Sequence, residues 1–258
     1  MGDIEKTASF KEATTSPQAS FWMEAMEEEM ESLNKNETWK LTTLPVGRQP
    51  IQIRWVYKLK LDGDGDVRRY KARLVAKGFS QRPGIDFEET FSPVVKHDSL
   101  RVVLALTAEL DLKMLQLDVK TAFLNGDLHE DLYMVQPMGF IQPGREDAVC
   151  KLNRSLYGLK QASRAWNTKF HNALAGFGFV RSSADQCVYV LQEKGCLTIF
   201  AIWVDDGLIC SSSGEKLKSV VDYLAQNFEM TCGPPDCFVG IQLSRDRAKK
   251  TVHLHQEN

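Results

Sequence analysis

The sequence lacks a long apolar run, an export signal and any paired cysteine motif. Apolar stretches such as residues 197–204 fall well short of the ~20 residues that a membrane span requires. The N-terminus opens with acidic residues and no apolar run follows, so we expect no signal peptide. The six cysteines are scattered without the spacing of a zinc site, which favours reduced thiols inside a cell over a zinc-binding or exported protein.

The composition excludes fibrous and disordered proteins. Hydrophobic residues make up 43% and charged residues 26% of the 258 positions, close to the average for soluble globular proteins. This length corresponds to one large domain or two small ones. There are no internal repeats or low-complexity tracts, so solenoid and propeller architectures are excluded as well.

The small net charge of −2 conceals two oppositely charged segments. Residues 1–38 hold nine acidic residues and three lysines, a net charge of −6. Residues 54–82 hold nine basic and three acidic residues, a net charge of +6. A compact basic block suits an anionic partner such as phosphate, and the alternative is a solvated hairpin face.

The N-terminal half is expected to begin with loose structure and then to fold into a helix and a hairpin. The polar segment up to about residue 20 is expected to be loosely ordered. Residues 21–33 carry apolar side chains at helical spacing, which predicts an amphipathic helix whose stripe packs on a core. Residues 51–61 and 67–77 are predicted strands, joined into a basic β-hairpin by the Asp/Gly-rich turn at 62–66.

The remainder alternates between helices and strands. Helices are predicted at residues 99–110, capped by Ser99 or Asp98, and at 163–177 and 215–228. Strands are predicted at 114–119, 132–135, 149–152, 187–191, 197–204, 207–210 and 238–243. Mixed hairpins and helices indicate an α+β fold rather than a parallel αβ repeat.

Two carboxylate features stand out among these strands. Asp205 and Asp206 sit together between two apolar strands, and Asp118 closes the strand 114–119. If these strands are neighbours in one sheet, the three carboxylates meet at one edge, where they would bind hard divalent cations such as Mg²⁺. The residues alone leave that convergence open, and a simple Asp-Gly turn is the alternative for the Asp205–Asp206 pair.

An ordered series of motifs runs along nearly the whole chain. They read WMEAM at 22–26, NETWKL at 36–41, RWVYKLK at 54–60, YKARLVAKGF at 70–79, GIDFEETFSPVV at 84–95, QLDVKTAFLNG at 116–126, SLYGLKQASRAW at 155–166 and VDD at 204–206. In these motifs the chain resembles the reverse transcriptase of copia-type LTR retrotransposons, specifically the fingers–palm part of the Pol polyprotein.

The resemblance implies an RNA-directed DNA polymerase that adds dNTPs to a primer 3′-OH by two-metal phosphoryl transfer. Asp118, Asp205 and Asp206 are then the catalytic, metal-binding residues, with two Mg²⁺ ions as cofactors and Mn²⁺ as the alternative. The implied partners are dNTPs and an RNA or DNA template with its primer, without a membrane. The implied location is a cytoplasmic virus-like particle, with the nucleus as the alternative.

The resemblance also assigns residues that bind substrate. Phe123 falls where the family keeps an aromatic gate against the ribose 2′-OH, with a buried core ring as the alternative. Tyr157 and Gly158 fall in the segment that packs against nucleotide and template. Lys71 and Arg73 are candidates for gripping the triphosphate, with exposed hairpin charges as the alternative. The expected nucleic-acid contacts are Arg54, Lys58, Lys60, Arg68 and Lys77.

The implied fold is a right-hand polymerase palm of split βαβ, ferredoxin-like type with a fingers β-hairpin and helices. The expected domains are an N-terminal amphipathic helix region at 1–44, the fingers hairpin at 45–97, a palm at 98–243 with an interleaved fingers segment at 124–160, and the start of a truncated thumb at 244–258.

The chain departs from the family pattern in three places. Trp203 replaces the usual tyrosine before Val-Asp-Asp, the segment 232–240 is altered and one residue shorter, and the chain stops at Asn258, where a thumb would begin. These departures keep an alternative function open, which is a non-catalytic remnant or domesticated fragment acting at most as a nucleic-acid-binding module.

Overall fold

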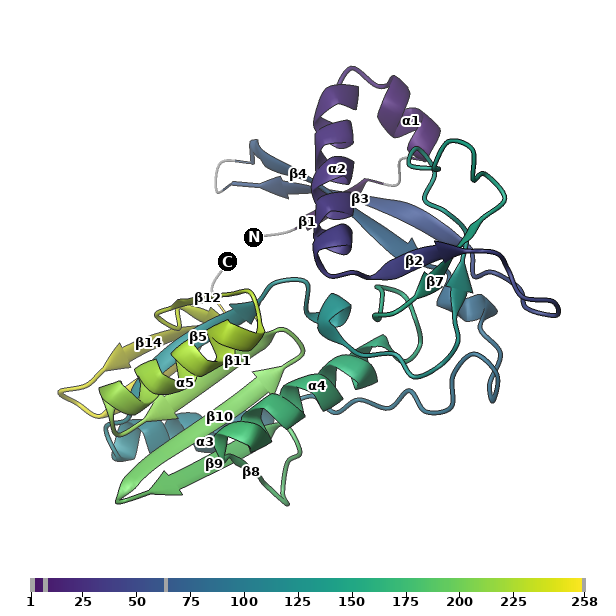
Figure 1. Ribbon diagram of the computed structural model, residues 1–258. Helices are drawn as coiled ribbons and strands as arrows, with labels where there is room; N and C mark the ends of the chain where they lie inside the picture. The colour runs from purple at the N-terminus through teal and green to yellow at the C-terminus, as the bar shows by residue number, and fades with distance from the viewer. Residues whose placement is uncertain (1–2, 7–8, 63–64, 257–258) are drawn as a thin grey trace. The chain divides into compact units, whose positions relative to one another are not determined.

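The computed structural model describes residues 3–6, 9–62 and 65–256, and shows a mixed α/β fold (Figure 1). The chain forms two compact units, Met1–Phe91 with Phe123–Trp166, and Ser92–Ala122 with Asn167–Asn258. Each unit is therefore built from two separate stretches of chain. Among the described residues, no helix has the length and apolar character needed to cross a bilayer.

The first unit is organised around the predicted basic hairpin. β3 (Ile53–Leu61) and β4 (Val67–Ala76) pair antiparallel, and β1 (Asp3–Lys6) pairs with the other side of β3. β4 is thus an edge strand of the three-stranded sheet β1-β3-β4. The hairpin is confirmed, while Gly63 and Asp64 in its predicted turn lie outside the described residues.

The predicted amphipathic helix packs against this hairpin. It is α2 (Ala19–Lys35), and its buried face meets the side of the sheet where Tyr57 and Leu74 are buried. Trp22 of α2 contacts the ring of Tyr57 edge-on at 5.1 Å between centroids. The Tyr57 hydroxyl donates to the Met26 sulfur over 3.3 Å. The apolar stripe of α2 is therefore core, as its spacing predicts.

The expectation of loose structure before residue 20 is wrong. Residues Phe10–Thr15 form the short helix α1, and β1 precedes it. Ser9 and Glu12 form a capping box, in which the Ser9 hydroxyl accepts from the Glu12 N–H and the Glu12 carboxylate accepts from the Ser9 N–H. This reciprocal pair stabilises the first turn of a helix that is too short to show apolar periodicity.

A second small sheet completes the first unit. It has the order β2-β7-β6, formed by Trp39–Thr42, Val149–Leu152 and Tyr133–Met134. The short helices η1 (Gly78–Ser80) and η2 (Ala122–Asn125) follow β4 and β5 in the chain. The strands predicted at 132–135 and 149–152 are confirmed, with the first one shorter than expected.

The second unit is built on a six-stranded sheet with the order β12-β5-β11-β10-β9-β8. The strands are β5 (Lys113–Val119), β8 (Val180–Arg181), β9 (Val188–Glu193), β10 (Cys196–Trp203), β11 (Asp206–Ser211) and β12 (Met230–Gly233). The residues alone left open whether 114–119 lies beside the 197–210 hairpin, and the structure shows that it does, because β5 pairs with β11.

Helices cover both faces of this sheet (Figure 1). α4 (Ala162–Phe177) places Phe170 against Phe200 of β10 at 5.5 Å between ring centroids, and α5 (Gly214–Asn227) packs beside it through Tyr223 and Phe177. α3 (His97–Glu109) lies on the opposite face, where the Thr107 hydroxyl hydrogen-bonds the thiol of Cys210. The three predicted helices are confirmed to within two residues at either end.

Two details of this unit differ from expectation. α3 begins at His97 and not after a Ser99 or Asp98 cap; the Asp185 carboxylate accepts from the Lys96 N–H at this end of the helix. Residues 238–243 do not form one strand, because β13 (Cys237–Phe238) turns back into β14 (Ile241–Asp246), which pairs with β15 (Thr251–His255). Val239 and Gly240 make that turn with φ of 52° and 72°.

Candidate active site

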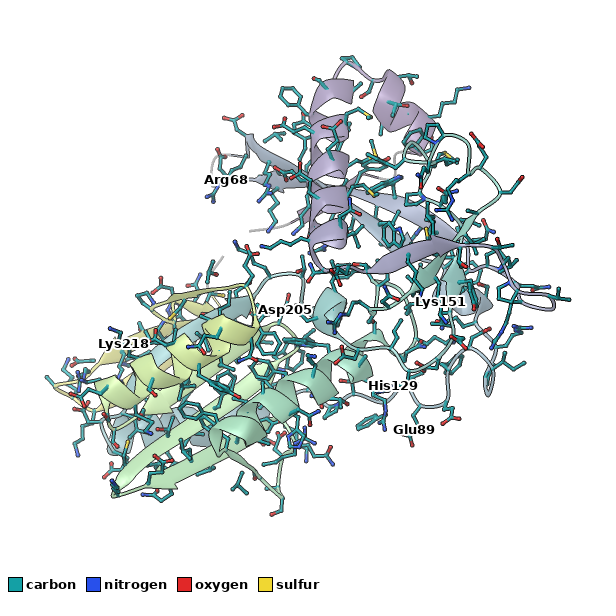
Figure 2. The ribbon with its side chains drawn as sticks, in the orientation of Figure 1. Arg68, Glu89, His129, Lys151, Asp205 and Lys218 are labelled. Atoms are coloured by element: carbon teal, nitrogen blue, oxygen red, sulfur yellow. The ribbon has the colours of Figure 1, made fainter. Side chains whose placement is uncertain are left out.

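The turn between β10 and β11 presents two adjacent carboxylates. Trp203 pairs with Asp206, which leaves Val204 and Asp205 as the two turn residues. Val204 has φ of 55°, a left-handed conformation that is strained for a β-branched side chain. Strain of this kind persists where the surrounding structure enforces it, and here the apolar strands on both sides do so. Asp205 is exposed in the turn, where Figure 2 labels it, and Asp206 is half-buried.

The neighbouring strand brings a third carboxylate to the same end of the sheet. Asp118 of β5 stands directly opposite Asp206 in the antiparallel register. The Val119 N–H donates to the backbone oxygen of Asp205 over 3.0 Å and ties the turn to β5. Directly opposed residues have their Cβ atoms about 4.5–5.5 Å apart. The structure thus brings together the strands that carry the three aspartates singled out in the sequence.

Electrostatics at this sheet end disfavour three free negative charges. Burial raises the pKa of Asp206 to about 6, and the charges of Asp205 and Asp118 act in the same direction. The Gln116 amide donates to Asp206 at 3.5 Å and opposes the shift only weakly. A carboxylate crowded by two others is stabilised in its charged form by a nearby cation.

The chemistry of these donors fits a divalent metal. Carboxylate oxygens are the ligands that Mg²⁺ and Mn²⁺ take in proteins. In the described part of the chain, no three His, Cys, Asp or Glu side chains are grouped closely enough to form a ready-made metal site. The fit therefore rests on the donor set and on the mutual repulsion that a bound cation would relieve.

The hairpin of the first unit carries its cations on one face. Side chains alternate along a strand, and the register sets Lys58 opposite Lys71, Lys60 opposite Arg69, and Val56 opposite Arg73. The other face holds the buried residues that pack under α2. The residues on this basic face are Arg54, Lys58, Lys60, Arg69, Lys71 and Arg73.

Like charges directly opposed across two strands are destabilising. On the other side of β3, the register sets Glu5 opposite Lys58 and Asp3 opposite Lys60, so acidic residues offset part of this repulsion. Burial lowers the pKa of Lys71, and the charges of Arg73 and Lys60 lower it further. An anionic ligand would reverse that repulsion. Four of the residues predicted to contact nucleotide or nucleic acid (Arg54, Lys58, Lys60 and Arg73) share this face with Lys71.

Two other predicted contacts lie elsewhere. Arg68 sits at a register shift, between the Lys60–Arg69 and Leu61–Val67 pairs, and lines a pocket with Phe21 and Tyr70 (Figure 2 labels Arg68). Lys77 follows the end of β4, where its N–H donates to the Gln52 carbonyl over 2.7 Å.

The predicted nucleotide-side aromatics meet one another. The rings of Phe123 and Tyr157 are 5.3 Å apart at 67°, an edge-to-face contact. The Arg73 guanidinium lies over the Tyr157 ring at 5.1 Å from its centroid. Phe123 is only partly buried, against the edge of the core. Gly158 has φ of 86°, a conformation that favours glycine.

Two residues that lie close to the basic face are not singled out in the sequence analysis. Arg69 belongs to the basic face and pairs with Glu28 at 2.7 Å. Glu29 of α2 is buried, and its carboxylate accepts from the Leu74 N–H over 3.2 Å. Its position on the apolar stripe, three residues after Met26 and four before Leu33, was the available signal.

The chain is similar to known proteins over its whole length. A family model described as "Reverse transcriptase (RNA-dependent DNA polymerase)" matches residues 36–257. The Retrovirus-related Pol polyprotein from transposon TNT 1-94 of Nicotiana tabacum is 46% identical over 259 residues, covering 100% of this chain and 20% of that protein. The corresponding polyprotein from transposon RE1 of Arabidopsis thaliana is 44% identical, covering 91% of this chain and 16% of that protein.

The chain therefore spans about a fifth, or less, of the length of these relatives. Among solved structures, a foamy viral protease-reverse transcriptase in complex with double-stranded DNA aligns with a TM-score of 0.44 and 10% identity, covering 90% of this chain and 35% of that chain.

Proposed function

Because this chain belongs to the reverse transcriptase family of copia-type Pol polyproteins, we propose that it is a template-directed DNA polymerase. In this reaction the primer 3′-OH attacks the α-phosphate of a dNTP and pyrophosphate leaves. The observation that carries the proposal is the register that sets Asp118 opposite Asp206, with Asp205 in the adjoining turn.

Asp118, Asp205 and Asp206 would hold the divalent metal, either Mg²⁺ or Mn²⁺. When bound there, the metal supplies positive charge that activates the attacking hydroxyl and stabilises the leaving phosphates. The chain's own contribution is a rigid arrangement, with Asp118 and Asp206 on paired strands and Asp205 in the adjoining turn. The hydrogen bond from the Val119 N–H to the Asp205 carbonyl holds that turn in place. Small displacements at a reacting centre lower the rate strongly, so this rigidity matters for catalysis.

The basic face would bind the phosphate groups of the nucleotide and the template. Lys71 and Arg73 would grip the triphosphate, since fixed cations stabilise the charge that shifts onto the leaving group. Phe123 would exclude a ribose 2′-OH by its bulk, and Tyr157 with Gly158 would form the surface beside the nucleotide. Arg54, Lys58, Lys60, Arg68 and Lys77 would contact backbone phosphates, which position a template without reading its sequence.

These roles correspond to a division into fingers and palm. We assign residues 1–44 to an N-terminal helical region, 45–97 to the fingers hairpin, and 98–243 to a ferredoxin-like palm with a fingers insertion at 124–160. The six-stranded sheet with helices on both faces and carboxylates at one strand end supports the palm assignment. Residues 244–258 would begin a thumb.

The test is primer extension on a poly(rA)/oligo(dT) template with Mg²⁺ or Mn²⁺. Asp205→Asn removes one ligand charge, and Asp222→Asn, an exposed carboxylate on α5, is the matched control. We expect the wild type and the control to incorporate dTTP, Asp205→Asn to lose roughly a hundredfold or more, and EDTA to abolish the reaction.

One observation favours a second function, a nucleic-acid-binding module without catalysis. The register gathers cations on the basic face, which would bind anions whether or not the aspartates act. A folded wild type that binds the primer–template yet incorporates nothing with either metal would establish this second function and overturn the first.

A further inference from the structure

Tyr157 joins two groups that come from distant parts of the first unit. Arg73 lies on β4, Phe123 lies in η2, and Tyr157 lies in the segment before α4. The face of the Tyr157 ring meets the Arg73 guanidinium at 5.1 Å, and the ring meets Phe123 edge-to-face at 5.3 Å. Both are favourable geometries for an aromatic ring, so each neighbour is held in a preferred orientation.

The backbone of Tyr157 is itself fixed on the outer edge of β4. Its carbonyl accepts from the Ala76 N–H over 2.7 Å. A Cβ on Gly158 would lie 2.2 Å from the Ala76 oxygen, and a Cβ on Gly78 would lie 2.1 Å from the Gly158 oxygen. Such close backbone approach leaves the Tyr157 ring little freedom to shift along the strand.

The outer edge of β4 is also held at Leu74. The Leu74 N–H, two residues before Ala76, donates to the buried carboxylate of Glu29. The outward N–H groups of an edge strand normally face solvent. Here the N–H groups of Leu74 and Ala76 both donate to acceptors within the first unit. The strand that carries Arg73 and the segment that carries Tyr157 therefore form one rigid piece.

We propose that Tyr157 is a positioning residue for sugar discrimination, holding Phe123 in its gate orientation and Arg73 in its phosphate-gripping orientation at the same time. The inference rests on the proposed polymerase function and deepens it. Its consequence is that selection of deoxyribose and grip on the triphosphate are coupled through one ring. Loss of the ring would weaken both, whereas loss of a merely structural aromatic would weaken neither.

The experiment compares Tyr157→Leu, Tyr157→Phe and the control Phe140→Leu. Phe140 is a partly buried ring that packs against the same core and contacts Trp55 at 5.8 Å between ring centroids. Each variant is assayed for kcat and KM with dTTP and with UTP on poly(rA)/oligo(dT), and its melting temperature is recorded.

We expect Tyr157→Leu to raise the KM for dTTP several-fold and to lower the dTTP-over-UTP ratio of kcat/KM about tenfold. Tyr157→Phe keeps the ring and should keep both values within about twofold. Phe140→Leu should lower the melting temperature while leaving the ratio unchanged. A discrimination ratio unchanged in Tyr157→Leu, or lowered equally in Phe140→Leu, would overturn the proposal.

If the wild type does not incorporate nucleotide, the polymerase proposal fails separately. The role of Tyr157 is then decided by the rise in melting temperature that dTTP and UTP produce on the protein–primer–template complex. Preferential stabilisation by dTTP that is lost in Tyr157→Leu and kept in Tyr157→Phe supports the proposal. Equal stabilisation by both nucleotides, or none by either, overturns it.

Discussion

Glu29 is a carboxylate that the fold buries at an energetic disadvantage. Only 8% of its surface is exposed, on the face of α2 that packs against β4. Burial raises its pKa, although the hydrogen bond from Leu74 and the charges of Arg73 and Lys71 act in the opposite direction. Since the charged form is disfavoured in the folded state, Glu29 lowers stability at high pH.

Replacing Glu29 by glutamine should therefore stabilise the protein in a pH-dependent way. As pH falls, a group whose pKa is raised by folding binds its proton at a higher pH in the folded protein than in the unfolded chain. The loss of stability caused by the Glu29 charge is therefore complete above the folded pKa and fades as pH falls toward the ordinary value near 4.5. We expect Glu29→Gln, which keeps an acceptor for Leu74, to raise the melting temperature by roughly 2–4 °C at pH 8 and by much less at pH 5. Thermal unfolding at both pH values measures this.

The exposed neighbour Glu28, paired with Arg69, serves as the control for that prediction. Glu28→Gln should change the melting temperature little at either pH, because an exposed ion pair contributes little to stability. A gain for Glu29→Gln that is the same at pH 5 and pH 8 would show that its charge is not the cause.

At the scale of single residues, the local sequence pattern predicted the strands that carry the aspartates but not the contacts between residues far apart in the chain. The apolar strands ending at Asp118 and before Asp205 could be recognised locally, so their pairing could be anticipated. The contact of Arg73 with Tyr157 joins residues far apart in the chain, and no local pattern encodes it. Val204 occupies a left-handed conformation that its residue type disfavours, so only the fold explains it.

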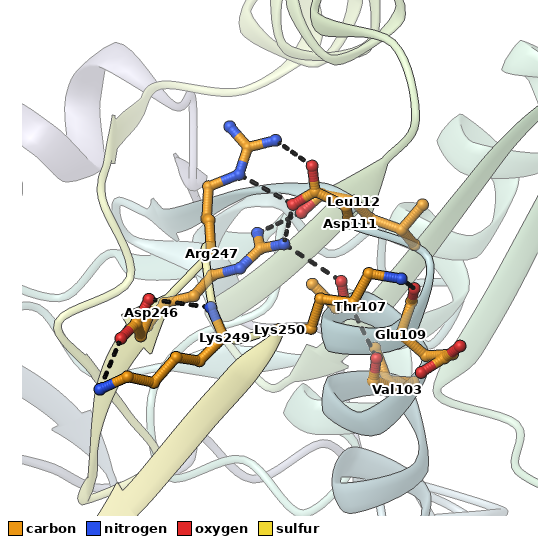
Figure 3. Close-up of polar contacts among 10 residues, drawn as sticks. Val103, Thr107, Glu109, Asp111, Leu112, Asp246, Arg247, Lys249 and Lys250 are labelled. Carbon is orange, nitrogen blue, oxygen red and sulfur yellow. Dashed lines mark hydrogen bonds and ion pairs between the residues drawn. The ribbon is translucent and has the colours of Figure 1, made fainter.

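At the scale of elements, the C-terminal hairpin β14–β15 is fastened to the end of α3 by arginines (Figure 3). Arg247 forms a two-pronged ion pair with Asp111, with distances of 2.6 and 2.8 Å. Arg245 donates to Asp111 at 3.0 Å, to the Thr107 carbonyl at 3.2 Å and to the Leu112 carbonyl. Those carbonyls lie at and after the last turn of α3, where helices leave acceptors unsatisfied.

Removing Arg245 should loosen this hairpin selectively. Arg245 has 14% of its side chain exposed, and Arg245→Met removes its three hydrogen bonds from a largely buried site. Asp111 keeps its ion pair with Arg247, and the Thr107 carbonyl keeps the Leu112 N–H. We expect amide hydrogen exchange across residues 241–255 to speed up at least tenfold, with β5 and β11 unchanged. The control Lys249→Met removes an exposed i,i+3 pair with Asp246 and should leave the exchange unaltered. Faster exchange throughout the second unit in Arg245→Met would contradict this prediction.

The elements themselves were predictable where their periodicity was long. α2, α4 and α5 exceed three turns, and their bounds agree with the expectation from apolar spacing. The turn between β13 and β14 was missed because Val239 does not signal a turn, and the single Gly240 beside it is compatible with an apolar strand. α1 was missed because one and a half turns show no period, although its Ser9–Glu12 capping box was readable.

At the scale of the whole molecule, charge is segregated along the chain. The chain carries −2 overall, while residues 54–82 alone carry +6 and form the hairpin with the basic face. Binding of a nucleic acid to such a surface releases counterions, so affinity must fall as salt rises.

The double variant Arg54→Gln/Lys60→Gln should measure this directly. If both side chains neutralise phosphates, the slope of log affinity against log salt for an RNA–DNA primer–template becomes shallower by about 2, roughly one unit for each cation removed. Fluorescence anisotropy at several salt concentrations gives the slope. The charge-matched control Lys218→Gln/Lys249→Gln, which lies off the basic face, should keep the wild-type slope (Figure 2 labels Lys218). An equal change in both double variants would assign the effect to net charge alone.

The order of strands in the six-stranded sheet has a consequence for folding during synthesis. β5 lies between β11 and β12, yet the ribosome delivers β5 roughly 90 residues before β11. At ordinary elongation rates this leaves both edges of an apolar strand without a partner for about 5–20 s. An unpaired strand edge is a site of wrong association, so the nascent chain depends on shielding during this interval. The strand that carries Asp118 is thus exposed to wrong pairing during synthesis.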